Sequence, residues 1–375
     1  MTSKKYDGVI GALKGLVTAN GGSNMASSDE TNSVTLTAVG DILMHGRVYG
    51  GLKKTSGYNF NRQLQNVNGL LGETDITIAN LESIIAGNEV GLSSFPKFNG
   101  PVEIGYTLKE MGVNLVTIAN NHVLDRGEEG LLKSIENLEE IGLEYDGAYK
   151  SLEDSERLRI ITKNGLRICF ISYTRGTNGI KIPEDKPYLV NSLRKTTTLK
   201  LSKALRKIKS ENLADVIIVN LHFGEEYHLN PSRAQRELAA SLSDAGADVI
   251  LGHHPHVLQP PEWIENSRGM KTFVAYSLGN FFTGQNGLHR QIGATLSLKI
   301  TQPDKNYRGI VIEDPKFNLT FVNREKRLRY DIYRFSEWIQ GNEFIETADG
   351  KFPSAKVYED VKRRMKSKMS DLLVE

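Results

Sequence analysis

The chain has 375 residues, of which 39% are hydrophobic and 25% are charged. These proportions are ordinary for a globular protein and exclude a chain that is disordered over most of its length. The 47 lysines and arginines against 45 acidic residues leave a net charge of +2, so no nucleic acid is expected as a partner. The length allows one large α/β domain with appendages, or two domains.

The first 32 residues are predicted to be a flexible lead-in. Small and polar residues fill positions 20–24 and 26–33, as they do in linkers. Residues 8–19 are the most apolar part of this segment, but Lys14 interrupts them. They fall short of the ~20 apolar residues that a membrane-spanning helix needs. The sequence therefore predicts no transmembrane segment.

From residue 34 onward, short apolar runs alternate with helical patterns. The runs are rich in β-branched residues and nearly continuous, which is typical of strands covered on both faces. They predict strands at residues 34–39, 75–79, 114–119, 167–172, 215–220, 248–251 and 272–276. Apolar residues at helical spacing predict helices at 128–141, 195–210 and 231–245. This alternation predicts an α/β fold with helices on both faces of the sheet.

The pattern changes after about residue 290. Residues 291–300, 309–313 and 317–322 have the texture of strands with turns between them, and they predict a β-rich continuation of the same domain. A terminal helix is predicted over residues 356–373. We therefore expect a main domain over residues 33–335 and a helical extension over residues 336–375.

Polar residues of a restricted set follow the predicted strands. Asp41, Glu82, Asn121 and His222 each lie just beyond a strand, and residues 253–256 place three histidines in four positions. In α/β sheets, ligands bind beyond the carboxyl ends of the strands. Taken singly, Asp41 and Glu82 are more typical of helix caps or turns, and a lone histidine is more often structural. Taken together, the set predicts a metal centre.

The predicted ligands offer oxygen and imidazole donors and no thiolate, which suits one or two divalent ions such as Mn²⁺, Fe or Zn²⁺. They are Asp41, Glu82, Asn121, His222, His254 and His256. Two ions about 3.5–4 Å apart would stabilise a hydrolytic transition state. His122 follows Asn121 and is predicted to donate a proton, and Asp41 is the second predicted catalytic residue. His45 lies outside these strand ends and is predicted to be a surface or partly buried residue.

These residues lie in six motifs that resemble the ordered motifs of the CapA/PgsA family of capsule-synthesis proteins. The resemblance spans residues 34–285. The motifs are GDILMHGR at 40–47, ANLE at 79–82, ANNHVLDRG at 119–127, HFGEEY at 222–227, GHHPHVLQ at 252–259 and YSLGNF at 276–281. That family is in turn similar to calcineurin-like metallophosphoesterases, so the resemblance implies an αββα two-sheet sandwich of the metallophosphatase type.

The resemblance also implies roles for individual residues. The metal-binding positions of the phosphoesterase pattern fall on Asp41, Glu82, Asn121, His222, His254 and His256. Glu82 stands where the phosphoesterases place a bridging aspartate, and His122 matches their proton-donating histidine. Leu43 is a departure, because it stands where the phosphoesterase pattern has a histidine. This departure implies that one ion is weakly held or absent, and it argues against carrying phosphoesterase activity over.

The family link implies poly-γ-glutamate, or a related amide or peptide-like polymer, as an anionic substrate, and membrane subunits of a capsule synthase as partners. Residues predicted to bind the polymer through charge-assisted bonds are Arg47, Lys97, Arg126 and Arg175. An equally weighted alternative is that these four are solvated or salt-bridged. Glu226 and Tyr227 are included in the predicted binding region, where they would orient His222.

Members of the family usually carry an N-terminal membrane anchor and act outside the cell. Because the sequence predicts no transmembrane segment, we expect either a soluble part separated from its anchor or a cytoplasmic member. The leading functional hypothesis is a metal-dependent hydrolase in capsule polymer synthesis or processing. The alternatives are a non-catalytic polymer-binding or scaffold component of the capsule synthase, and a metallophosphoesterase. Only the hydrolase and the phosphoesterase need a metal, and only the phosphoesterase would cleave an aryl phosphate.

Overall fold

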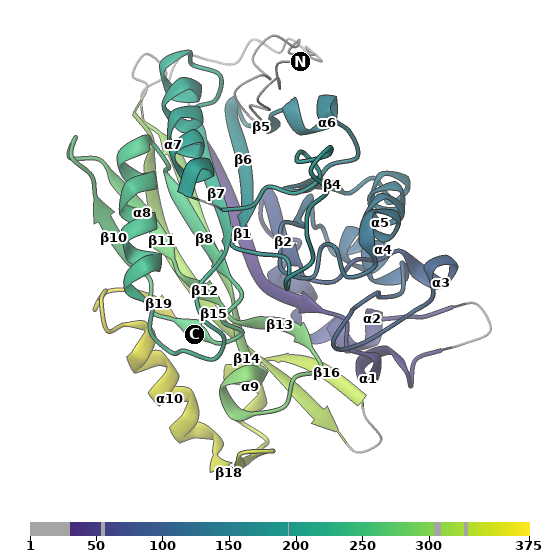
Figure 1. The fold of residues 1–375 in the computed structure, drawn as a ribbon. Helices are drawn as coiled ribbons and strands as arrows, with labels where there is room; N and C mark the ends of the chain where they lie inside the picture. The colour runs from purple at the N-terminus through teal and green to yellow at the C-terminus, as the bar shows by residue number, and fades with distance from the viewer. Residues whose placement is uncertain (1–30, 54–56, 194, 304–308, 326–328) are drawn as a thin grey trace.

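The computed structural model describes residues 31–53, 57–193, 195–303, 309–325 and 329–375. It contains two large β-sheets packed face to face, with helices on the outer side of each sheet (Figure 1). The predicted α/β class is thereby confirmed. The predicted lead-in falls outside the described residues except at its end, where Asn32 already begins a strand. None of the helices among the described residues has both the length and the apolar character needed to cross a membrane.

The first sheet combines a parallel half with an antiparallel half. Its strands are β1 (Asn32–Leu43), β2 (Ile76–Leu81), β3 (Leu115–Thr117), β4 (Glu144–Asp146), β13 (Asn280–Thr283), β14 (Ile292–Gln302), β15 (Val311–Glu325), β16 (Arg329–Arg334) and β19 (Leu373–Val374). The order is β16-β15-β14-β1-β2-β3-β4, with β13 beside β1 and β19 beside β15. Strands β1 to β4 are parallel, and β14 to β16 form an antiparallel meander next to β1.

The second sheet has a parallel centre with an antiparallel strand at each edge. Its strands are β5 (Arg159–Lys163), β6 (Leu166–Thr174), β7 (Val216–His222), β8 (Val249–His253), β10 (Glu262–Glu265) and β11 (Lys271–Ala275). The order is β10-β11-β8-β7-β6-β5. The predicted strands correspond to β1, β2 and β3 in the first sheet and to β6, β7, β8 and β11 in the second.

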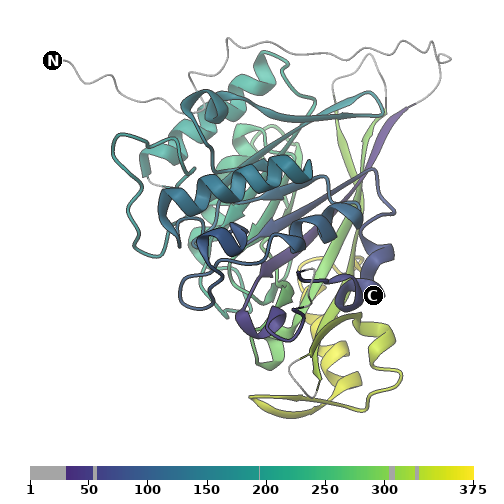
Figure 2. The same ribbon diagram turned by 90° about the vertical axis from the view of Figure 1, so that its right-hand side faces the viewer.

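Three layers of apolar contacts hold the two sheets and their helices together. Helices α4 (Glu103–Glu110) and α5 (Gly127–Ile141) cover the first sheet, and α7 (Lys195–Ser210) and α8 (Arg233–Ala245) cover the second (Figures 1 and 2). Strand β7 shows why the predicted runs are nearly continuous. Ile218 packs in the cluster between the sheets, whereas Ile217 packs in the cluster with α7 and α8, so successive residues are all buried.

The remaining elements lie between these strands and helices or form the C-terminal part of the chain. They are α1 (Gly46–Tyr49), α2 (Asn61–Leu64), η2 (Gln65–Leu70), α3 (Gly87–Val90), α6 (Leu152–Glu156), β9 (Leu258–Gln259), β12 (Ser277–Leu278), η3 (Leu288–Gln291), α9 (Phe335–Trp338), β17 (Phe344–Thr347), β18 (Gly350–Pro353) and α10 (Ser354–Met365). Strands β17 and β18 form a hairpin that precedes α10. The C-terminal hairpin and helix (yellow) gather at one end of the molecule in Figure 2.

The C-terminal prediction needs a correction. The expected helix over 356–373 ends at Met365, and Leu373–Val374 instead pairs with β15 as a parallel strand. The β17–β18 hairpin also shows that residues 336–375 are not wholly helical. The predicted helix was too long because Met369 and Leu372, which follow the helix, are buried in the same cluster as the residues of α10 and continue its apolar pattern.

Candidate metal centre

The two sheets end together where the predicted ligands lie. Asp41 is in β1 and pairs with Asn80 of β2, so Glu82 follows one strand away. His222 ends β7 and pairs with His253 of β8, which brings the loop after β8 to the same edge. The carboxyl ends of the parallel strands therefore converge as the sequence predicts.

Glycines allow the backbones to approach closely just before these side chains. A Cβ atom at Gly40 would lie 2.1 Å from the carbonyl oxygen of Gly279, and one at Gly252 would lie 2.0 Å from that of Tyr276. After Gly252, His254 and His256 take positive φ angles of 96° and 57°. Such angles are rare for residues other than glycine and are typical of strained functional loops.

A first cluster consists of Asp41, Glu82 and His256. All three are buried, and one candidate ligand atom from each lies within 4.8 Å of the others. His256 Nδ1 is 3.1 Å from Asp41 Oδ2, and His256 Nε2 is 3.5 Å from Glu82 Oε1.

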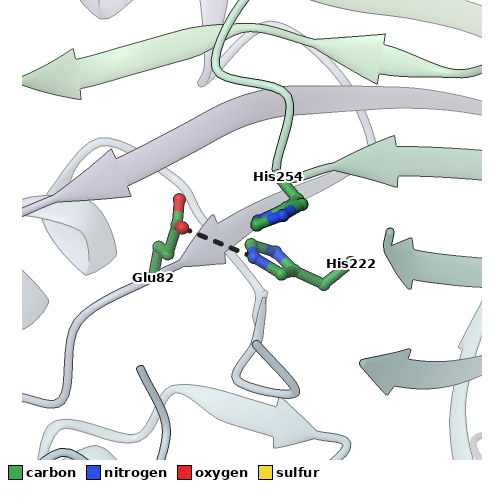
Figure 3. A group of neighbouring side chains, drawn as sticks. All are labelled: Glu82, His222 and His254. Carbon is green, nitrogen blue, oxygen red and sulfur yellow. Dashed lines mark ion pairs between the residues drawn. The ribbon is translucent and has the colours of Figure 1, made fainter. Parts of the chain in front are cut away.

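A second cluster consists of Glu82, His222 and His254, again with ligand atoms within 4.8 Å of one another. Figure 3 shows the two imidazoles side by side, with Glu82 facing His222 and its Oε1 3.4 Å from His222 Nε2. The ring centroids of His222 and His254 are 4.8 Å apart. Glu82 belongs to both clusters, so one carboxylate stands between two groups of candidate ligands.

The hydrogen bonding of these side chains fits a divalent cation. Within the described part of the chain, no hydrogen-bond partner reaches either oxygen of Glu82, Nδ1 of His222 or Nδ1 of His254, although all four atoms are buried. Buried polar atoms are rarely left without a partner, because their desolvation is costly. Carboxylate and imidazole together are donors that manganese, iron and zinc ions accept.

The pKa values of the two carboxyl groups are shifted in opposite directions by burial and by neighbouring groups. Burial favours the protonated form of Asp41, but hydrogen bonds from His253 and His256 outweigh it and hold the pKa of Asp41 well below its usual range. Burial raises the pKa of Glu82 well above its usual range. Burial alone would lower the pKa of His256, but the charges of Glu82 and Asp41 raise it to about 9. In the absence of a cation, a proton therefore stays on the Glu82–His256 pair near neutral pH.

The imidazoles of the second cluster behave differently. Burial holds the pKa of His222 well below its usual range, and it lowers the pKa of His254 to about 4. Both rings are therefore neutral near neutral pH, and a neutral imidazole is the form that binds a metal.

Buried amide groups and a hydroxyl group contact the candidate ligands or their neighbours and fix their orientation. The sequence predicted no role for these residues. Asn80 Nδ2 donates to Asp41 Oδ1 at 2.8 Å, and Thr117 donates to the amide oxygen of Asn80 at 3.1 Å. Asn280 Oδ1 lies 3.1 Å from His256 Nδ1. Asn80 and Asn280 stand in two of the recognised motifs, so their position at strand ends was the available signal.

Asn121 and His122 lie beside the second cluster. The amide oxygen of Asn121 is 2.8 Å from His222 Nε2. His122 Nδ1 is 2.7 Å from Asp125 Oδ2, an oxygen that also accepts the Phe98 N–H at 2.6 Å. A carboxylate that accepts the Nδ1 proton fixes the orientation and tautomer of an imidazole. Asp125 is a residue that sequence reasoning missed.

The predicted polymer-binding residues are placed in different surroundings. Arg175 is exposed and lines a cavity of about 320 Å³ together with His222, His254 and Asn178. Arg126 lies away from this lining, because its guanidinium donates to the carbonyls of Val90 and Gly91 and to Ser93 Oγ. The side chains of Arg47 and Lys97 are exposed.

Glu226 and Tyr227 lie near the candidate ligands, and the charge of Glu226 acts on both His254 and His256. Both side chains are exposed, and the Tyr227 ring is 6.2 Å from the ring of His256, so the tyrosine lies beside His256 rather than against His222 as predicted. His45 is more buried than expected, at 5% exposure, with its ring against Phe98.

A family model described as "Bacterial capsule synthesis protein PGA_cap" matches residues 35–285. "Capsule biosynthesis protein CapA" of Bacillus anthracis is 30% identical over 261 residues, which are 68% of this chain and 61% of that protein. "PGA biosynthesis protein CapA" of Bacillus subtilis is 35% identical over 180 residues, 48% of this chain and 44% of that protein.

A third relative is a "Probable polyglutamine synthesis accessory protein" of Mycobacterium tuberculosis, 24% identical over 225 residues, 57% of each chain. The chain thus spans between 44% and 61% of the length of these relatives. The matched residues 35–285 are more than half of the chain and include every predicted ligand. The chain therefore belongs to the family of bacterial capsule synthesis proteins described as PGA_cap.

Proposed function

We propose that the protein is a metal-dependent hydrolase with an αββα fold of the metallophosphatase type, acting on poly-γ-glutamate or a related amide or peptide-like polymer. The observation that carries this proposal is the shared position of Glu82 between two clusters of candidate ligands, Asp41–Glu82–His256 and Glu82–His222–His254. One or two divalent ions held there would supply positive charge that polarises a carbonyl group and activates water.

The chain's own residues would bind the substrate and move the proton. His122 follows Asn121, whose amide oxygen contacts His222, so the proposed proton donor is next to the second cluster. Asp125 accepts the hydrogen bond of His122 Nδ1 and so orients the ring that would protonate the leaving nitrogen of a cleaved amide. Arg175 offers an exposed guanidinium in the cavity beside His222 and His254, where it would bind a carboxylate of the polymer.

The names of the relatives support the substrate class. Two are named for capsule or PGA biosynthesis and one for polyglutamine synthesis. We therefore include an anionic glutamate polymer as the ligand in this proposal. Membrane subunits of a capsule synthase are the protein partners that we propose from the family resemblance.

Metal content is the first test. Protein purified without chelator should contain one or two divalent ions per chain, and the double variant His254→Ala/His256→Ala should lose them. His228→Ala is the matched control, because His228 is exposed and lies outside both clusters. The wild type should then cleave a defined γ-linked glutamate oligomer, and the double variant should not.

The outcomes separate the alternatives. Wild-type protein that binds no metal, even after incubation with Mn²⁺ or Zn²⁺, would exclude the hydrolase and favour a non-catalytic polymer-binding component. Metal-dependent cleavage of an aryl phosphate, with the oligomer left intact, would favour a phosphoesterase instead.

A further inference from the structure

Tyr227 is held in an unusual backbone conformation beside the metal centre. Its φ angle is 65°, in the left-handed region, and its N–H donates to the carbonyl of Pro255 at 2.8 Å. Pro255 lies between two candidate ligands, so this bond ties Tyr227 to the ligand loop. The ring of Tyr227 is 6.2 Å from that of His256, while 45% of the residue remains exposed. A rare conformation at such a place is typical of a functional position.

The guanidinium of Arg290 lies against the ring of Tyr227, and the backbone of Arg290 is linked to His256 through Asn280. Its guanidinium carbon is 5.0 Å from the centroid of the Tyr227 ring, a cation–π contact. Its backbone carbonyl accepts a hydrogen bond of 2.8 Å from Asn280, whose amide oxygen lies 3.1 Å from His256 Nδ1. Both the side chain and the backbone of Arg290 are therefore tied to residues that lie next to the metal centre.

The C-terminal hairpin holds the segment that carries Arg290. Asp349, in the turn between β17 and β18, accepts the Leu288 N–H at 2.8 Å, and Asn286 Oδ1 accepts the Ala348 N–H at 3.1 Å. Asp349 Oδ1 is also 3.6 Å from a terminal nitrogen of Arg290. These contacts lie outside residues 35–285, which the family model matches. The hairpin thus adds to the centre a positioned arginine that the family motifs do not include.

The guanidinium of Arg290 retains capacity for a ligand. It has five N–H donors, of which one is engaged by the Tyr227 side chain, and the 3.6 Å separation from Asp349 exceeds an ordinary hydrogen bond. The Arg290 side chain is 32% exposed. A planar guanidinium matches a carboxylate better than any other side chain does, because it can donate two parallel hydrogen bonds.

We propose that Arg290, seated on Tyr227, is a carboxylate-binding subsite next to His256, and that it binds a free carboxylate of a γ-linked glutamate polymer. This inference rests on the proposed function, because it takes the polymer as the ligand of the centre. It extends that function by placing a second guanidinium against Tyr227, the ring that neighbours His256, whereas Arg175 lines the cavity with His222 and His254. A polymer chain bound by both arginines would pass over the metal ligands.

Calorimetric titration with tetra-γ-glutamate, and with the same oligomer carrying amides in place of its free carboxylates, tests the subsite. Arg290→Gln should weaken binding of the acidic oligomer about tenfold and leave binding of the amidated oligomer unchanged. Arg268→Gln is the matched control, because Arg268 is exposed in the turn before β11, at the end of that strand away from the centre. Metal content should be the same in all three proteins.

The acidic and the amidated oligomer together distinguish a carboxylate-binding role of Arg290 from a structural role. If Arg290→Gln weakens both oligomers equally, or neither, the subsite is wrong and the proposed function stands. If the metal-loaded wild type binds neither oligomer, the proposed substrate class is wrong and the subsite falls with it. If Arg290→Gln does not fold, Arg290→Lys tests the subsite instead. Arg290→Lys should bind the acidic oligomer several-fold more weakly and the amidated oligomer equally well. An unchanged affinity for the acidic oligomer would contradict the paired hydrogen bonds from Arg290.

Discussion

Replacing Glu82 by glutamine would distinguish a metal ligand from a structural acceptor. Glu82 is fully buried, its oxygens lack a hydrogen-bond donor among the described residues, and its burial raises its pKa well above the usual range. A raised pKa means that the folded state disfavours the carboxylate. Metal-free protein therefore loses stability as the pH rises from the unfolded pKa through the folded one. Glutamine has nearly the same shape and no charge, so Glu82→Gln should not destabilise the metal-free protein.

Glu82→Gln should raise the free energy of unfolding without metal and lower it with metal. A buried polar group without a partner costs about 1–3 kcal/mol, and a charged one costs more, so the glutamine saves the part of the cost that is due to the charge. His256 Nε2, 3.5 Å from Glu82 Oε1, offsets part of that cost, so the metal-free variant should gain about 1 kcal/mol. A cation at about 1,000 times its Kd adds about 4 kcal/mol to the wild type. The variant should gain little of this, because Glu82 belongs to both clusters, so it should be less stable by about 3 kcal/mol when metal is present.

Urea denaturation followed by circular dichroism, with EDTA and then with saturating Mn²⁺, measures both differences. Glu184→Gln is the matched control, because Glu184 is exposed, and it should change neither curve. Equal destabilisation of Glu82→Gln in EDTA and in Mn²⁺ would refute the reasoning. It would show that the carboxylate of Glu82 stabilises the fold and does not bind a cation.

Metal binding should release about one proton near neutral pH, with an affinity that rises up to a pH of about 9, because the cation displaces the proton held by His256 and Glu82. Titration calorimetry in buffers of different ionisation enthalpy measures that proton, and no release would contradict the coupling. Asp125→Ala should lower kcat about 100-fold with unchanged metal content, because His122 loses the acceptor of its Nδ1 proton; an unchanged kcat would show that Asp125 does not support proton transfer by His122. Arg126→Ala should lower the free energy of unfolding by about 1–3 kcal/mol without weakening oligomer binding, because its guanidinium donates to backbone carbonyls. Weaker binding at unchanged stability in a denaturant titration would restore its predicted role.

Much of the candidate site could be predicted because parallel strands bring their carboxyl ends to one edge. Asp41 and His253 are 212 residues apart in sequence, yet their side chains lie 3.1 Å apart because each stands at the end of an apolar run. The strand pattern located that edge. The residue types after each strand then indicated the chemistry.

Side-chain direction could not be predicted in the same way. Arg126 and Arg175 both follow strand ends, but only Arg175 lines the cavity, because local loop carbonyls accept the donors of Arg126. Arg290 was missed because its relation to His256 depends on a hairpin more than 50 residues further along, whose Asp349 lies 61 residues from Leu288. The terminal helix was drawn too long because buried residues after Met365 continue the helical spacing through a turn.

The ligands divide by chemistry between the two sheets. Asp41 and Glu82 come from the ends of β1 and β2 in the first sheet, and the imidazoles come from β7 and the loop after β8 in the second. A cation at this edge would therefore join a layer of carboxylates to a layer of imidazoles. The core between the sheets, which includes Leu36 and Ile218 at 0% exposure, fixes their spacing independently of any cation. The affinity for such a cation would then depend on the loop after β8, where His254 and His256 have positive φ angles, so substitutions there could change the affinity without altering the fold.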